Sequence, residues 1–165
     1  MLKAASLFLL FSACLSFGFG KSHALKKRLE FLRELKKALL LLSGEIRCAK
    51  TPLPDAFRKI GGKLREPLRG FFQSVAKELE GEGRKLPEIV FQNQLGCLGE
   101  SAWNREDRAF LLELGKQLGC PDLSVQLQTL ELFEEGLREL IKKASEDCRE
   151  KAKIYRYLGA LSGLF

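Results

Sequence analysis

The chain lacks most of the side chains from which catalytic and metal centres are built. His23 is its only histidine, and its five cysteines are widely spaced without a Cys-x-x-Cys pair. A zinc site of thiolates and imidazoles needs more closely paired ligands than these. The sequence also has no glycine-rich phosphate loop, no His-Glu-x-x-His and no Gly-x-Ser-x-Gly. We therefore expect no enzymatic activity, no metal and no cofactor.

Residues that favour β-strands are also scarce. Leu, Lys, Glu and Arg dominate the 165 residues, whereas Val, Ile and Thr are few. This balance predicts an all-α protein, and the length suits one compact domain. Because the cysteines are odd in number and scattered, we expect free thiols, buried or half-buried, in a reducing compartment.

The positive charge of the chain is concentrated near its N-terminus. The net charge is +7, and residues 21–50 alone carry nine basic and three acidic side chains. Residues 51–144 carry fourteen basic and fifteen acidic side chains, so this part is nearly neutral. A nucleic-acid-binding domain would spread its basic residues over one face with interleaved aromatics, and we expect no nucleic-acid partner.

Residues 4–20 form an uncharged, largely apolar run of 17 residues between Lys3 and Lys21. At about 1.5 Å per residue, this run reaches across a bilayer core if the flanking lysines extend to the interface. Its features fit best with a transmembrane anchor over residues 1–21. A cleaved signal peptide and a lipoprotein signal with Cys14 as the acceptor remain as alternatives.

Basic residues follow the apolar run in greater number than they precede it. They are the membrane-proximal residues Lys21, Lys26, Lys27 and Arg28. By the positive-inside rule, this asymmetry places residues 22–157 in the cytoplasm. The same residues would attract anionic lipids.

Two long segments have the seven-residue spacing of paired helices. Leu25, Leu32, Leu39 and Ile46 repeat in the first, and Leu123, Leu130, Leu137 and Ala144 repeat in the last. Each apolar stripe needs a partner of similar length, so we expect the two helices to pair antiparallel. Four shorter amphipathic segments lie between them, at about 52–60, 67–80, 87–98 and 104–118. The chain is thus predicted to be a membrane-anchored bundle of about six helices.

Several residues mark the ends of these helices. Thr51 is predicted to cap the second helix with its side chain, with Pro52 as the first helical residue. Asn104 is predicted to cap the fifth helix, with Asp107 as a capping-box partner. Glu45 either caps locally or presents a charge to a partner.

Two glycines and the C-terminal segment also bear on the architecture. Gly115 and Gly119 permit close helix approach or end a helix, and the ending is favoured because Pro121 follows. Basic and tyrosine residues precede the apolar segment 158–165, which predicts the start of a second, truncated membrane helix.

Short motifs in a fixed order make the chain resemble the stage III sporulation protein AB family of endospore-forming bacteria. The motifs occur at the opening Met-Leu-Lys, at the end of the first long helix, before the last long helix, and at Leu158-Gly159. The motif residues that we single out as interaction candidates are Glu45, Thr51, Pro52, Leu53, Gly115, Leu118, Gly119, Asp122 and Gln126.

The resemblance implies a function that composition and residue spacing alone do not predict. Members of that family sit in the mother-cell membrane, are required for sporulation and belong to the stage III A assembly, a secretion-like channel between mother cell and forespore. Their helical domain is similar to those of inner-membrane platform protein F of type II secretion and type IV pilus systems. We therefore expect a non-enzymatic platform subunit whose partners are the other subunits, above all the cytoplasmic secretion-type ATPase. The basic residues after the apolar run make membrane lipids a further expected partner, and homo-oligomerisation remains open.

The competing hypothesis is a peripheral lipid-binding helical protein. Its functional element would be the basic helix that follows the apolar run. Replacement of the basic residues distinguishes the two hypotheses.

Overall fold

The computed structural model describes residues 2–81, 85–99 and 103–162. Side chains are described over residues 23–81, 85–99 except Cys97, 103–151, and at Ile154. The described chain is helical throughout, with six α-helices, one short 3-10 helix and no strand. In order these are α1 (Leu2–Ala49), α2 (Leu53–Gly61), α3 (Leu68–Glu80), α4 (Pro87–Gln94), η1 (Leu95–Leu98), α5 (Arg105–Leu118) and α6 (Leu123–Ser162). The predicted all-α bundle of about six helices is confirmed.

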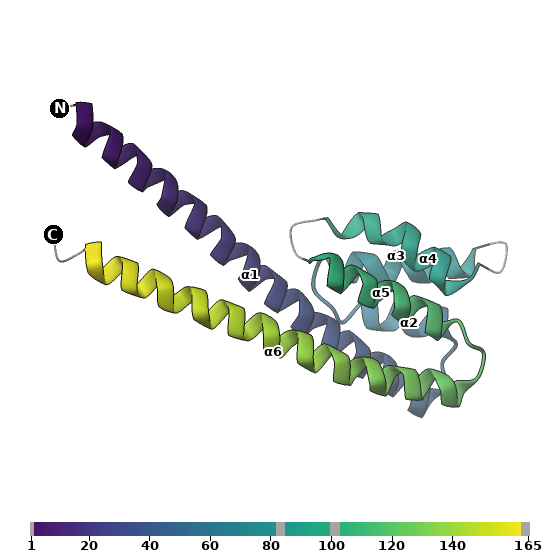
Figure 1. Cartoon of the computed structure of the whole chain (residues 1–165). Helices are drawn as coiled ribbons and strands as arrows, with labels where there is room; N and C mark the ends of the chain where they lie inside the picture. The colour runs from purple at the N-terminus through teal and green to yellow at the C-terminus, as the bar shows by residue number, and fades with distance from the viewer. Residues whose placement is uncertain (1, 82–84, 100–102, 163–165) are drawn as a thin grey trace.

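Helices α1 and α6 lie side by side and run in opposite directions, so that the start of α1 and the end of α6 point to the same side (Figure 1). The seven-residue stripes form their contact, because Leu32, Leu39, Leu130, Leu137 and Ala144 are completely buried. The predicted antiparallel pair is therefore confirmed. Helix α1 continues without interruption through the predicted boundary at residues 21 and 22.

The four short helices pack on one side of the far half of this pair (Figure 1). Four phenylalanines, from α2, α3 and α4, form the centre of their core. The ring centroids of Phe57, Phe71, Phe72 and Phe91 lie 5.1–5.7 Å apart in stacked, tilted and edge-on pairs. Such pairs add to the free energy gained by burying the rings. This cluster therefore packs α2, α3 and α4 against one another.

No helix in the part of the chain that the structure describes is long and apolar enough to cross a membrane. The predicted anchor at 1–21 and the predicted membrane segment at 158–165 lie outside the residues with described side chains.

Candidate interaction site

The motif residues gather at one end of the bundle. The turn from α1 to α2 and the turn from α5 to α6 both lie at the end opposite the start of α1 and the end of α6 (Figure 1). We call residues 45–63 and 115–126, together with the start of α4, the distal end. An ion pair of 2.5 Å between Arg47 Nη2 and Glu131 Oε1 links α1 to α6 in this region.

The first turn begins where α1 ends. Lys50 has a left-handed backbone, with φ of 46°, which is a common way to end a helix but is rare for a residue other than glycine. The Thr51 N–H then donates to the Glu45 carbonyl at 3.4 Å. This reversal turns the chain back and places the side chain of Thr51 beside Glu45.

The predicted cap of α2 by Thr51 is wrong. Pro52 is the residue before the helix, no side chain caps its N-terminus, and the Pro52 carbonyl accepts from the Ala56 N–H at 2.9 Å. The Thr51 hydroxyl instead donates to Glu45 Oε2 at 3.4 Å and accepts from Lys59 Nζ at 3.3 Å. The reason is the reversal at Lys50, which brings the hydroxyl to the last turn of α1 instead of the first turn of α2. Leu53, half-buried, is the first helical residue.

Glu45 is the centre of the cluster at this turn. Its carboxylate lies 3.0 Å from Lys59 Nζ and 3.5 Å from Lys63 Nζ, and it is 17% exposed. The hydrogen bond from Lys59 lowers the pKa of Glu45 below its ordinary value, and desolvation opposes this. Because its own chain supplies these partners, the geometry favours the local role of Glu45, which ties α1 to α2, over contact with a partner.

The second turn is held by Asp122 and Gln126. Asp122 Oδ1 accepts from the Ser124 N–H at 2.8 Å and from the Ser124 hydroxyl at 2.6 Å, which lowers the pKa of Asp122. The Gln126 side-chain amide donates to the carbonyls of Leu118 and Cys120 at 3.2 and 2.7 Å. These bonds satisfy the free carbonyls at the end of α5 and fix the direction in which α6 leaves.

Two roles were predicted for Gly115 and Gly119, close helix approach and helix ending, and each glycine has one of them. A Cβ on Gly115 would lie 2.6 Å from Phe91 Cγ, so Gly115 permits the close approach of α4 to α5. Gly119 is the residue that ends α5. Leu118, between them, is completely buried. The motif residues of this turn are therefore accounted for by packing and by helix ends.

The distal end also carries apolar side chains that the sequence interpretation missed. Leu86 and Ile89 at the start of α4 are 59% and 49% exposed, and Leu123 and Val125 at the start of α6 are 39% and 40% exposed. Pro87 packs against Gly119, so the start of α4 adjoins the turn into α6. Leu123 was predicted as part of the buried stripe, but α1 ends before it can cover this residue. The sequence offered one signal of this surface: Val125 is an apolar residue that does not belong to the buried seven-residue stripe, so it was a candidate for exposure.

One of the predicted membrane-proximal cations has another role. Arg28 Nε and Nη2 donate to Asp107 Oδ2 and Oδ1, both at 2.8 Å, and the side chain of Arg28 is only 12% exposed. The position of Arg28 near the membrane stays a prediction, but its guanidinium is not free, because the completely buried carboxylate of Asp107 requires a paired cation. This pairing raises the pKa of Arg28. Lys26 and Lys27 are exposed, and the side chain of Lys21 lies outside the described residues.

The predicted capping box at the start of α5 is confirmed. Asn104 Oδ1 accepts from the Asp107 N–H, and Asp107 Oδ2 accepts from the Asn104 N–H, both at 2.9 Å. Asp107 therefore holds the helix start and Arg28 at once. It is a link between α1 and α5 rather than a free acid.

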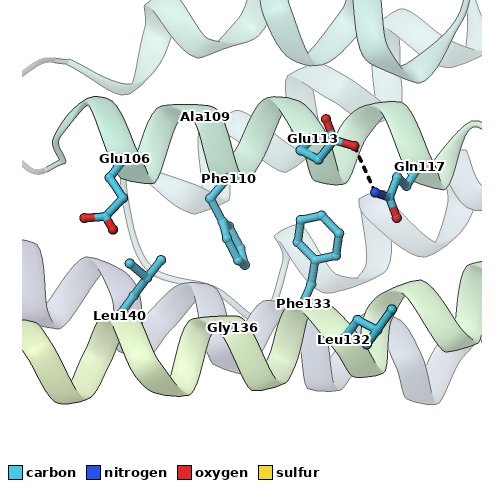
Figure 2. Close-up of a pocket in the computed structure, with 9 residues that line it drawn as sticks. All are labelled: Glu106, Ala109, Phe110, Glu113, Gln117, Leu132, Phe133, Gly136 and Leu140. Carbon is cyan, nitrogen blue, oxygen red and sulfur yellow. Dashed lines mark hydrogen bonds between the residues drawn. The ribbon is translucent and has the colours of Figure 1, made fainter.

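A hollow of 520 Å³ lies between α5 and α6. Figure 2 shows Phe110 and Phe133 between the two helices, and their rings meet edge-on at 4.9 Å. Of the two carboxylates on its rim, Glu106 is paired with Lys143 at 3.5 Å, and Glu113 accepts from Gln117 at 2.9 Å. The hollow is thus mainly apolar, and its carboxylates already have partners.

Metal-ligating side chains do not converge in the described part of the chain, which holds no group of three His, Cys, Asp or Glu suited to a metal ion. The described cysteines, Cys48, Cys120 and Cys148, are free. Cys120 and Cys148 are half-buried, as expected, whereas Cys48 is exposed.

The fold and the distal end define a class of protein: an all-α bundle built on two long antiparallel helices, in which the motif residues hold helix ends and turns. The family model of stage III sporulation protein AB matches residues 3–165, and the chain belongs to this family. It is 24% identical over 148 residues to stage III sporulation protein AB of Bacillus subtilis (strain 168), covering 89% of this chain and 86% of that protein. It is also similar to a solved structure of stage III sporulation protein AB, with a TM-score of 0.66 and 22% identity over 74% of this chain and 97% of the other. That likeness confirms the fold.

Proposed function

We propose that this chain is a non-enzymatic platform subunit of the stage III A sporulation channel assembly. Membership of the stage III sporulation protein AB family supports a role in sporulation. The polar clusters of the distal end support a scaffold over an enzyme, because Glu45, Asp122 and Gln126 bond to neighbouring groups of their own chain.

The proposed orientation follows from the two long helices. The apolar run at 4–20 forms the first part of α1, and residues 158–162 are the last of α6, so the two proposed membrane segments lie on the same side of the bundle (Figure 1). The distal end then projects away from the membrane. Lys26 and Lys27, exposed just after the first segment, favour the cytoplasmic side for residues 22–157.

The observation that carries the proposed contact is the set of exposed apolar side chains at the distal end. Leu86 directly precedes α4 and Leu123 begins α6, beside a turn whose polar groups are already bonded. Large exposed apolar side chains that gather in one region are typical of protein interfaces. We propose that they contact the cytoplasmic secretion-type ATPase of the assembly.

The test is a double variant, Leu86→Ser with Leu123→Ser, made in the full chain in sporulating cells. Its matched control is Leu40→Ser, which removes an apolar side chain that is 51% exposed but lies on α1. We expect the double variant to lose co-purification of the ATPase and to lower spore counts, whereas the control keeps both. Thermal unfolding of the purified variants checks that each still folds. Equal recovery of the ATPase with both variants would overturn the proposed contact.

Sidedness is tested by labelling single cysteines placed at Ser22 and Ser145, in a chain without native cysteines. An impermeant reagent applied to intact cells should label neither position. Labelling of both would place the bundle outside the cytoplasm.

The competing lipid-binding hypothesis is tested by Lys26→Gln with Lys27→Gln, which leaves the Arg28–Asp107 pair intact. Lost sporulation together with lost vesicle binding would favour that hypothesis.

A further inference from the structure

Five charged side chains form a row along α6 that no part of the fold uses. They are Glu135, Arg138, Lys142, Glu146 and Arg149, at intervals of three, four, four and three residues. All five are exposed, and none has an ion pair or a hydrogen bond to another described residue. Oppositely charged residues three or four apart on a helix commonly pair. This row leaves its charges free.

The row faces away from the bundle. At 3.6 residues per turn, or about 100° per residue, its centre at Lys142 lies about 140° around α6 from the buried stripe of Leu137. The side of α6 that meets α5 through Phe133 lies farther from the row still. The row therefore lies on the solvent side of α6. Beside it is a hollow of 370 Å³, to which α1 contributes Arg33 and Lys36.

If the row is read from its C-terminal end, each outer position carries the charge opposite to the one found there when it is read from its N-terminal end. Read forward it is Glu, Arg, Lys, Glu, Arg, and read backward it is Arg, Glu, Lys, Arg, Glu. Two antiparallel copies of α6 that cross at Lys142 would place Glu135 against Arg149 of the second copy and Arg138 against Glu146 of the second copy. A twofold axis repeats both contacts, giving four ion pairs over about 21 Å of helix.

We propose that this row is the contact between two copies of the chain, related by a twofold axis that passes near Lys142. The inference rests on the proposed function in one respect, which is that both copies are held in one membrane. Exposed ion pairs each contribute little, so the contact is weak in dilute solution and sensitive to salt. Confinement of both copies to a membrane raises their effective concentration and favours the contact. The two Lys142 side chains, which meet at the axis, can turn toward Glu139 and Glu146.

Other occupants of this face fit the charges less well. A uniformly acidic partner segment or an anionic lipid surface would be attracted by the basic residues of the row and by Arg33 and Lys36 beside it, but it would be repelled by Glu135 and Glu146. Only a partner with alternating signs at the same spacing satisfies all four outer positions. The chain itself carries that pattern.

The first test is disulfide cross-linking of the full chain in vesicles. All five native cysteines are replaced by Ser, and a single cysteine is placed by Lys142→Cys, where residue 142 should meet itself at the axis. The matched control is Lys143→Cys, one residue further along the same helix but turned by about 100° toward α5. We expect Lys142→Cys to cross-link roughly tenfold faster than the control under mild oxidation. Equal rates would mean random encounters and would overturn the proposal.

The second test reverses charges in the Lys142→Cys chain. Arg138→Glu alone creates two Glu–Glu contacts, and Glu146→Arg alone creates two Arg–Arg contacts, so each should slow cross-linking by about fivefold. Both changes together restore opposite charges at every position and should restore the rate. Failure of the double change to restore the rate overturns the proposed register. Because these side chains are exposed and unpaired, melting temperatures should stay constant.

The outcomes are distinguishable from failure of the proposed function. If Lys142→Cys cross-links no faster than its control while the chain still associates with vesicles and still recovers the ATPase, only the proposed contact between two copies is wrong. Failure of the full chain to associate with vesicles at all counts against the platform proposal.

Discussion

Two regions of the molecule use the same kinds of residue with different consequences. One is α5 with its N-terminal cap, and the other is the junction of α1 and α2. Each has a carboxylate paired with one or two basic side chains, a polar residue within two positions of a helix start, and a glycine within a helix. The difference between them is burial, which sets how strongly each group affects stability.

The two carboxylates illustrate the difference. Asp107 is completely buried, and its partner Arg28 is 12% exposed. Glu45 is 17% exposed, but its partners Lys59 and Lys63 are 51% and 55% exposed. Water therefore competes for the partners of Glu45 and not for those of Asp107. Similar hydrogen-bond distances in the two regions do not imply similar energies.

The largest expected effect comes from Asp107→Ala. This change leaves Arg28 without its partner in a nearly closed site and removes half of the capping box, so we expect a loss of about 3–5 kcal/mol in the free energy of unfolding. Urea denaturation followed by circular dichroism measures it. Glu45→Ala is the matched change at the exposed junction and should cost much less. Equal losses at the two positions would break the comparison.

The glycines give the next largest contrast. Gly115→Ala forces a methyl group against Phe91, where a Cβ would lie 2.6 Å from the ring, and overpacking of this kind costs about 1–3 kcal/mol. Gly44→Ala, in α1 beside Glu45, meets nothing within 4 Å and should stabilise the helix by about 0.5–1 kcal/mol. Urea denaturation measures the change in the free energy of unfolding for each variant, and changes of opposite sign would support the comparison. A loss at both positions would contradict it.

The sequence predicts the architecture well because local patterns determine most of it. The seven-residue spacing of Leu32 and Leu39 identifies the paired long helices, and the glycines and prolines mark the breaks between the short ones. Residue type alone does not report where a helix partner ends. For this reason Leu123, which continues the stripe, was expected to be buried and is not.

The contacts of the two regions are harder to predict because they depend on chain reversal and on distant partners. The Asn104 cap follows from the spacing to Asp107, and it is confirmed. Arg28 lies 79 residues from Asp107. No local pattern connects them, so Arg28 was interpreted from its position beside the apolar run. Thr51 has the sequence of a cap, but the left-handed backbone at Lys50 directs it elsewhere.

The two polar residues before helices provide a smaller test. Asn104→Ala removes a formed cap, so we expect a loss of about 1 kcal/mol in the free energy of unfolding. Thr51→Ala removes only hydrogen bonds of 3.3 and 3.4 Å at a partly exposed position, and we expect a loss below about 0.5 kcal/mol. The two variants are compared in one denaturation series. A loss at Thr51 as large as that at Asn104 would mean that its hydroxyl contributes more than the geometry indicates.

The smallest expected effect is the pH dependence at Glu45. Its pKa is lowered in the folded chain, chiefly by the hydrogen bond from Lys59, so its stabilising contribution is present above the ordinary carboxyl pKa and is lost as pH falls through the folded pKa. Wild-type protein should therefore lose slightly more stability than Glu45→Gln between about pH 5 and pH 3, measured as melting temperature against pH.

Both proteins should still decline in this range, because Glu78 and Asp122 also have lowered pKa values. The matched control is Glu88→Gln, at an exposed carboxylate without an ion pair to another described residue. Its melting curve against pH should run parallel to that of the wild type. If the Glu45→Gln curve is parallel as well, the lysines at the junction do not hold Glu45 in solution, and the energetic gap between the two regions is wider than their geometry indicates.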